Sequence, residues 1–158
     1  LPVIKKFKAA IIVLTMDDRG IPDSPVERLE VANKIVERLE AEGIERQDII
    51  VDCLSTSVGM QDKAAMITIE AMEMVRKQLG LNLIVGASNV SFGLPNRNEL
   101  NAAFLSIAVF SGLSCAIVDV ERVRPFIMAS DLLSGRDPRA RRYLRYCREI
   151  RSAKNSPS

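Results

Sequence analysis

The sequence predicts an α/β fold built from parallel strands, and three observations support this prediction. Four short apolar runs rich in β-branched residues recur along the chain. Each run is followed by a polar loop and then by a stretch with apolar residues at helical spacing. The repeat length of about 35–40 residues suits a strand–helix unit with a right-handed crossover.

The first unit begins with AAIIVLTM at residues 9–16, a continuous apolar run that is typical of a strand buried on both faces. The loop DDRGIPDS follows, and Asp23 or Ser24 can cap a helix that has Pro25 in its first turn. Gly43 ends this helix. Its apolar face is expected to consist of Val26, Leu29, Ala32, Ile35, Val36 and Leu39.

The same order recurs in the rest of the chain. Strands are expected at residues 48–53, 81–88 and 114–120, and helices at residues 62–79, 98–110 and 121–134. The helix at 98–110 is expected to present one apolar side made of Leu100, Ala103, Phe104, Ile107 and Ala108. Neither a GxGxxG nor a Walker A loop occurs, which favours half of an eight-fold β/α barrel over a nucleotide-binding doubly wound sheet. Four units alone would leave two open sheet edges.

The last stretch, residues 136–158, differs in composition from the predicted half-barrel at residues 1–135. The segment GRDPRARRYLRYCREIRSAKNSPS carries seven arginines and one lysine against two carboxylates. Its narrow apolar stripe predicts a basic amphipathic helix, and NSPS is expected to be disordered. The helix either lies on the outside of the barrel with a solvated basic face or docks an acidic partner or nucleic acid.

Composition limits the classes of function. The 158-residue chain is 47% apolar and has a net charge of +2 and 4% aromatic residues, so we expect no nucleic-acid partner. Its three cysteines show no CxxC spacing, which favours a reducing, cytoplasmic location. No apolar run is long enough to span a membrane, so we expect no membrane partner. The chain begins with Leu and LPVIKKFK reads like the end of a helix, so we expect a fragment.

Histidine is absent from the chain. This excludes Ser-His-Asp and Cys-His catalysis and histidine-ligated metal sites, and we expect no metal site. Any chemistry must therefore use carboxylates, amides, hydroxyls, arginine, lysine or a bound cofactor.

Polar residues gather where the predicted strands end. They are Thr15, Asp17, Asp18, Asp52, Ser55, Ser88, Asn89, Ser91 and Asp119. In a barrel the loops after the strands share one face, and that face carries the active site. The adjacent Asp17 and Asp18 could also bind magnesium, although such pairs are common in turns, and Asp119 is expected to cap the following helix.

The roles of the central candidates stay open at this level. Asp52 interrupts the apolar run IIVDCL, so it either accepts hydrogen bonds from a ligand or caps its own loop. Asn89 can donate and accept at once, which suits a heteroatom whose protonation changes, but turn asparagines also satisfy loop amides. Arg97 either reaches the pocket rim or pairs with a surface acid such as Glu99.

The stretch SNVSFGLPNR, followed by ELNAAFLSIAVFSGLSCAIVD, closely resembles the pterin-binding domain of methyltetrahydrofolate:corrinoid methyltransferases, including the folate domain of cobalamin-dependent methionine synthase. LTMDDRGIP, VERLEVANKIVERLEAEGI and IIVDCL match in the right order, so the resemblance covers nearly all of residues 1–135. It implies the carboxy-terminal half of a (β/α)8 TIM barrel.

The resemblance also implies a ligand and partners. Methyltetrahydrofolate would be the substrate, and the methyl acceptor would be a cob(I)amide corrinoid (cobalamin) on a partner protein or domain. Asp52 would bind the pterin ring, and Asn89, as the catalytic residue, would reach towards the methyl-bearing N5. Ser91 and Arg97 are further substrate-binding candidates. The other partners expected are the missing amino-terminal barrel half and a second copy of the chain.

The sequence departs from this family at several points. Cys53 stands where the family often has proline, no zinc-ligand cysteines occur, and the pterin-contacting residues of the amino-terminal half are missing. We therefore expect weak or no catalysis from the isolated chain. The alternatives are a non-catalytic half-barrel that self-associates or pairs with a separate amino-terminal half, and, more distantly, an enzyme similar to dihydropteroate synthase or a nucleic-acid-binding module.

Overall fold

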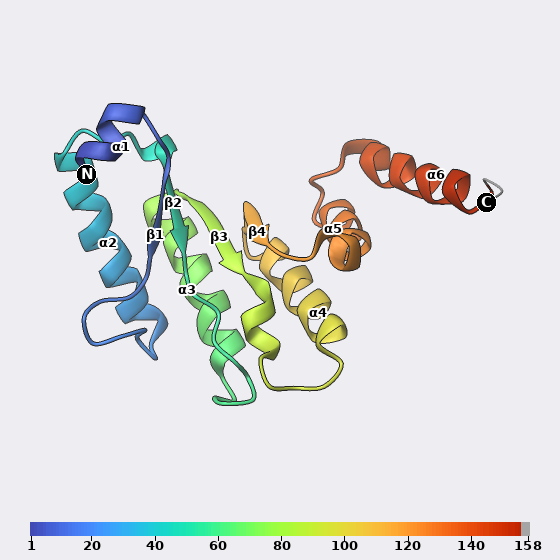
Figure 1. Cartoon of the computed structure of the whole chain (residues 1–158), viewed down its shortest axis with the longest axis horizontal. Helices are drawn as coiled ribbons and strands as arrows, with labels where there is room; N and C mark the ends of the chain where they lie inside the picture. The colour runs from blue at the N-terminus through green and yellow to red at the C-terminus, as the bar shows by residue number, and fades with distance from the viewer. Residues whose placement is uncertain (156–158) are drawn as a thin grey trace.

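A computed structural model of the chain describes residues 1–155, with side chains up to residue 152. Its core is one parallel sheet in which β1 (Ile11–Leu14), β2 (Ile49–Asp52), β3 (Asn82–Gly86) and β4 (Cys115–Ile117) lie in the order β1-β2-β3-β4. The order in the sheet is the order in the chain (Figure 1). This arrangement confirms the predicted α/β fold class, and it is that of a partial β/α barrel.

The helices alternate with the strands as expected. α1 precedes β1, each of the next four helices follows a strand, and α6 follows α5; three short 3-10 turns fall between these elements. The bounds are α1 (Pro2–Phe7), α2 (Pro25–Ala41), η1 (Arg46–Asp48), α3 (Ala64–Leu79), η2 (Ala87–Ser91), α4 (Arg97–Phe110), α5 (Val120–Leu133), η3 (Pro138–Ala140) and α6 (Arg141–Asn155). Over residues 1–155, no helix combines the length and apolar character needed to cross a bilayer.

Helices cover only one face of the sheet. Val13, Val51, Leu83 and Val85 are buried in a single core together with residues of α2, α3 and α4. The residues between them form the face opposite the helices, called here the open face: Ile12, Leu14, Ile50, Asp52, Asn82, Ile84, Gly86, Cys115 and Ile117. At its two edges this face exposes large apolar side chains, with Ile117 61% exposed. The open face therefore corresponds to the interior of a barrel.

The helical faces differ from the expectation in their rotation. Val26, expected on the buried side of α2, is 50% exposed, whereas Arg28 is buried in its place. On α4 the predicted Leu100, Ala103 and Ile107 are exposed. The buried residues of α4 are Ala102, Phe104, Leu105, Ala108 and Val109. Both helices are apolar over a wide arc, so spacing alone does not determine which part of the arc meets the sheet.

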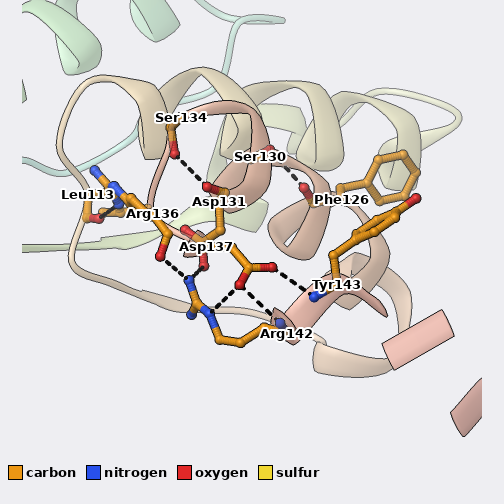
Figure 2. A network of polar contacts seen from close by, with 9 residues as sticks. All are labelled: Leu113, Phe126, Ser130, Asp131, Ser134, Arg136, Asp137, Arg142 and Tyr143. Atoms are coloured by element: carbon orange, nitrogen blue, oxygen red, sulfur yellow. Dashed lines mark hydrogen bonds and ion pairs between the residues drawn. The ribbon is translucent and has the colours of Figure 1, made fainter. Parts of the chain in front are cut away.

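α6 is joined to α5 by a compact polar network, shown in Figure 2. The Asp137 carboxylate is buried and accepts hydrogen bonds from the Arg142 amide at 3.0 Å and the Tyr143 amide at 2.9 Å. Arg142 also forms an ion pair with Asp131 of α5 at 3.0 Å and donates to the Arg136 carbonyl at 2.9 Å. Asp137 thus caps the start of α6, and Arg142 links α6 to α5.

The basic tail is helical as predicted. Most of its arginines are exposed, and α6 extends away from the sheet (Figure 1). The predicted boundary near residue 135 falls between α5 and η3, and a division into two parts there stays a prediction. Of the NSPS segment, Asn155 ends α6 and residues 156–158 lie outside the described residues.

Replacing Asp137 with alanine should loosen α6 without unfolding the sheet. The amides of Arg142 and Tyr143 would lose their acceptor, so their hydrogen exchange, measured by NMR, should accelerate roughly fivefold or more. The backbone hydrogen bond from Arg142 lowers the pKa of Asp137, so in the wild type this protection should be present at neutral pH and lost as the pH falls through that lowered pKa. Asp62→Ala, in an exposed loop, is the control; equal exchange rates in the wild type and Asp137→Ala would contradict the assignment.

Candidate functional site

The carboxyl ends of all four strands meet at one edge of the sheet because the strands are parallel. In Figure 1 the loops after β1, β2 and β3 all lie at this edge, at the lower end of the sheet. The predicted site residues lie on these loops or at the strand ends. The fold therefore brings to one edge side chains from Thr15 to Asp119, which are about a hundred positions apart in the sequence.

The loop after β2 is bonded directly to the loop after β3. The Ser55 hydroxyl donates to the Gly86 carbonyl at 2.7 Å, and the Ser57 hydroxyl donates to the Phe92 carbonyl at 2.6 Å. The backbone amide of Val58 donates to the Val90 carbonyl at 2.9 Å. These bonds hold the segment after Asp52 against η2, which carries Asn89.

Asp52 lies at the end of β2 on the open face, between Leu14 of β1 and Ile84 of β3. It is 8% exposed, and its Oδ1 accepts a hydrogen bond from the Leu54 amide at 2.8 Å. This is its one side-chain hydrogen bond within the described residues. Burial raises the pKa of Asp52, and the bond from Leu54 opposes that rise. The carboxylate thus caps its loop through Oδ1, while Oδ2 has no hydrogen-bond donor among the described residues.

Asn89 is exposed in η2, and its side-chain amide makes no hydrogen bond within residues 1–155. Its Nδ2 would lie only 3.3 Å from a Cβ built on Gly86. Gly86 ends β3 on the open face, so its missing side chain gives room for the amide there. Asn89 and Asp52 consequently share the same face and the same end of the sheet.

Ser91 and Arg97 are bonded to each other. Ser91 is fully buried, and its hydroxyl donates to Asn101 Oδ1 at 2.7 Å and accepts from Arg97 Nε at 3.1 Å. Arg97 also donates to the Ser88 carbonyl at 2.8 Å and lies over the Phe92 ring. Both residues therefore hold η2 and α4 together, and a direct contact of either with substrate stays a prediction.

Two of the remaining strand-end carboxylates form ion pairs within the fold. Asp17 is bound by Arg19, whose hydrogen bonds lower the pKa of the carboxyl. Asp119 occupies the N-cap position of α5 as expected, but its side chain makes no capping hydrogen bond and pairs with Arg122 at 2.9 Å instead. Thr15 follows β1 and is fully buried. Within the described part of the chain, no group of three or more histidine, cysteine or acidic side chains could hold a metal ion.

The sequence analysis missed Arg28, which is fully buried behind the exits of β1 and β2. Its Nη1 donates to the carbonyls of Cys53 and Leu54, both at 2.8 Å. A signal was available, because Arg28 stands four positions before Ala32 on the buried stripe of α2. A charged residue within an apolar stripe indicates a specific buried partner.

The comparisons with known proteins agree with this geometry. A model of the pterin binding enzyme family matches residues 1–119. Methionine synthase of Mycobacterium leprae (strain TN) is 29% identical over 133 residues, which covers 79% of this chain and 11% of that protein. Methylcorrinoid:tetrahydrofolate methyltransferase of Eubacterium limosum is 25% identical over 142 residues, or 88% of this chain and 52% of that protein.

The chain belongs to the pterin-binding enzyme family, since the family model covers most of its length. Methionine synthase of Mycobacterium tuberculosis (strain ATCC 25618 / H37Rv) is also similar, at 26% identity over 133 residues, 79% of this chain and 11% of that protein. The relatives named above are methyltransferases. The chain spans about half the length of one of them and a small part of the others.

A Gly86→Ala substitution should displace the Asn89 amide, because the new Cβ would come within 3.3 Å of Nδ2. The backbone at Gly86 has a negative φ that alanine adopts freely, so the free energy of unfolding should change by less than about 1 kcal/mol. The side-chain amide resonance of Asn89 should shift in 15N–1H spectra. Ser88→Ala on the same loop is the control, and an unshifted Asn89 resonance in Gly86→Ala would show that the amide does not lie over this glycine.

Proposed function

We propose that this chain is the carboxy-terminal half of a pterin-binding barrel that takes methyltetrahydrofolate and transfers its N5 methyl group to a corrinoid on a partner protein or domain. Family membership and the names of the relatives support this proposal. The observation that carries it is the pair of unused polar groups on the open face: the second Asp52 oxygen and the Asn89 amide.

Asp52 suits recognition of the pterin ring. A pterin presents neighbouring N–H donors at its edge, and a partly buried carboxylate is a strong acceptor for such donors. Asp52 is nearly enclosed, so few water molecules can reach its Oδ2. A hydrogen bond from a ligand would give this oxygen the partner that solvent supplies poorly. The Leu54 amide already holds Oδ1, so the free oxygen has a defined direction.

Asn89 suits the leaving nitrogen. A corrinoid supplies a nucleophilic cobalt(I) as the methyl acceptor when it is bound by its own protein. As the N5–methyl bond breaks, N5 keeps the electron pair, and it is a poor leaving group unless it is protonated or hydrogen-bonded. A neutral amide held at the site can donate that hydrogen bond or accept one from protonated N5, which is consistent with a chain that lacks histidine.

In this proposal, Ser91 and Arg97 support the site by holding η2 in place. Ser91 contributes through its bonds to Arg97 and Asn101, because its hydroxyl is enclosed. Arg97 keeps an exposed position at the rim beside Phe92, where its cation could also meet an anionic part of the substrate. Both would therefore affect binding more than the chemical step.

The site needs a second half-barrel. The open face and the β1 and β4 edges carry exposed apolar side chains and unpaired strand edges, which four further βα units would cover. A separate amino-terminal half is the partner that we propose first. Self-association of two such chains is the second candidate function, favoured by the same exposed face.

Asn89 and Asp52 should have separable effects on ligand binding and methyl transfer. With the amino-terminal half supplied, Asp52→Asn should weaken methyltetrahydrofolate binding roughly 10- to 100-fold by isothermal titration, because a charge-assisted hydrogen bond is lost. Asn89→Ala should slow methyl transfer to a free corrinoid roughly 100- to 1,000-fold with a smaller effect on binding. Asn33→Ala, on the outer side of α2, should change neither; full transfer activity in Asn89→Ala would remove the core of the proposal.

Exposure of the open face predicts the assembly of the chain alone. Light scattering should give a mass above that of a monomer, and Ile117→Lys on the open face should lower that mass through charge repulsion. Met60→Lys, which alters an exposed loop residue away from the open face, should not. A folded wild-type monomer at high micromolar concentration would argue against self-association while leaving the pairing with an amino-terminal half to be tested by mixing.

A further inference from the structure

Arg28 is a buried cation that has no acidic partner. It lies in the first turn of α2 with 0% of its surface exposed, and it forms no ion pair within the described residues. Burial lowers the pKa of its guanidinium. Its Nη2 is also enclosed without a hydrogen-bond partner. The charge of Asp23 attracts Arg28 without a direct ion pair, and burial of such a cation still opposes folding, so packing alone does not explain why this residue is arginine.

The guanidinium joins three segments around the site. Nε donates to the Pro22 carbonyl in the loop after β1 at 2.8 Å. Nη1 donates to the Cys53 and Leu54 carbonyls after β2, both at 2.8 Å, and lies 3.3 Å from Thr68 Oγ1 on α3. The described residues contain two further buried polar atoms without partners, on Thr15 and Thr56, and both belong to these same strand exits.

The segment held by Arg28 has a strained backbone. Leu54 adopts φ +54°, in the left-handed region that a branched side chain rarely enters. The Leu54 amide donates to Asp52 Oδ1 at 2.8 Å, and this N–H lies in the same peptide plane as the Cys53 carbonyl that Arg28 binds. Arg28 donates hydrogen bonds to the carbonyl that precedes this amide, that of Cys53, and to the carbonyl that follows it, that of Leu54. Arg28 therefore binds the carbonyls of the strained turn on the helix side of the sheet, while the Leu54 N–H binds the Asp52 carboxylate on the open face.

We propose that Arg28 is a positioning residue: by holding the Cys53 and Leu54 carbonyls, it fixes the Cys53–Leu54 peptide plane, directs the Leu54 N–H at Asp52 Oδ1 and thereby orients the Asp52 carboxylate towards the open face. Arg28 itself does not touch the ligand. Its value for pterin binding rests on the proposed function, whereas the mechanical link from Arg28 to Leu54 and Asp52 can be measured without any ligand.

The link is tested in the chain itself by NMR. Arg28→Met fills a similar volume without hydrogen bonds, Arg28→Lys keeps the charge and one donor, and Arg38→Met, an exposed arginine on the same helix, is the matched control. In Arg28→Met the Leu54 amide should exchange with solvent at least about tenfold faster and its resonance should no longer report the titration of Asp52. Arg28→Lys should be intermediate, and Arg38→Met should match the wild type.

The titration of Asp52 gives a readout that a packing role would not move. Loss of the Leu54 hydrogen bond removes the interaction that lowers the pKa of Asp52, so its titration should move to higher pH in Arg28→Met. The titratable neighbours are Cys53, the residue that follows β2, and Cys115 on β4. Burial raises the pKa of both thiols, to about 12 for Cys53, so neither interferes in the acid range.

Unchanged Leu54 exchange and Asp52 titration in a folded Arg28→Met would overturn the proposal. If neither Arg28 variant folds, the wild type still decides: guanidinium protons of Arg28 that exchange as fast as those of Arg38 would contradict the clamp. In the completed barrel, Arg28→Met should weaken methyltetrahydrofolate binding roughly tenfold or more, with partial rescue by lysine. If the clamp is present but methyltetrahydrofolate does not bind the wild type, the proposed function fails and the positioning role stands.

Discussion

Parallel pairing of the four strands is the constraint on which the rest of this structure depends. It requires each strand to return through a helix on the same side, which buries one face of the sheet and leaves the other open. It also brings every strand's carboxyl end to one edge, so residues from distant loops become neighbours. The site and the exposed open face are thus two consequences of the same topology.

The loops at this edge are held by neutral hydrogen bonds and by one buried cation. Ser55 and Ser57 bind the loop after β2 to η2, and Arg28 clamps the strained turn at Leu54. These hydrogen bonds restrict the motion of the loops at the strand ends. The groups left over, the Asp52 carboxylate and the Asn89 amide, can then be held in place by the scaffold before a ligand arrives.

Membership of the pterin-binding family gives these two groups a chemical context. A carboxylate such as that of Asp52 can accept hydrogen bonds from the N–H groups of a ring. A side-chain amide such as that of Asn89 can accept a hydrogen bond from a protonated nitrogen or donate one to an unprotonated nitrogen. The exposed apolar residues of the open face are as much a part of this interpretation, because a pterin pocket enclosed on one side only would leave the ring in water. In the proposed function, chemistry and assembly are therefore linked.

The sequence by itself determined the fold class, the order of the strands and helices, and the candidates Asp52 and Asn89, because periodicity, breakers and polar interruptions are local signals. Only the tertiary structure decided how the helices are rotated, which left Val26 and Ile107 exposed and placed Arg28 behind β2. It also showed that Gly86 leaves room for the Asn89 amide. These features depend on contacts between segments far apart in the chain, and no spacing within one segment records them.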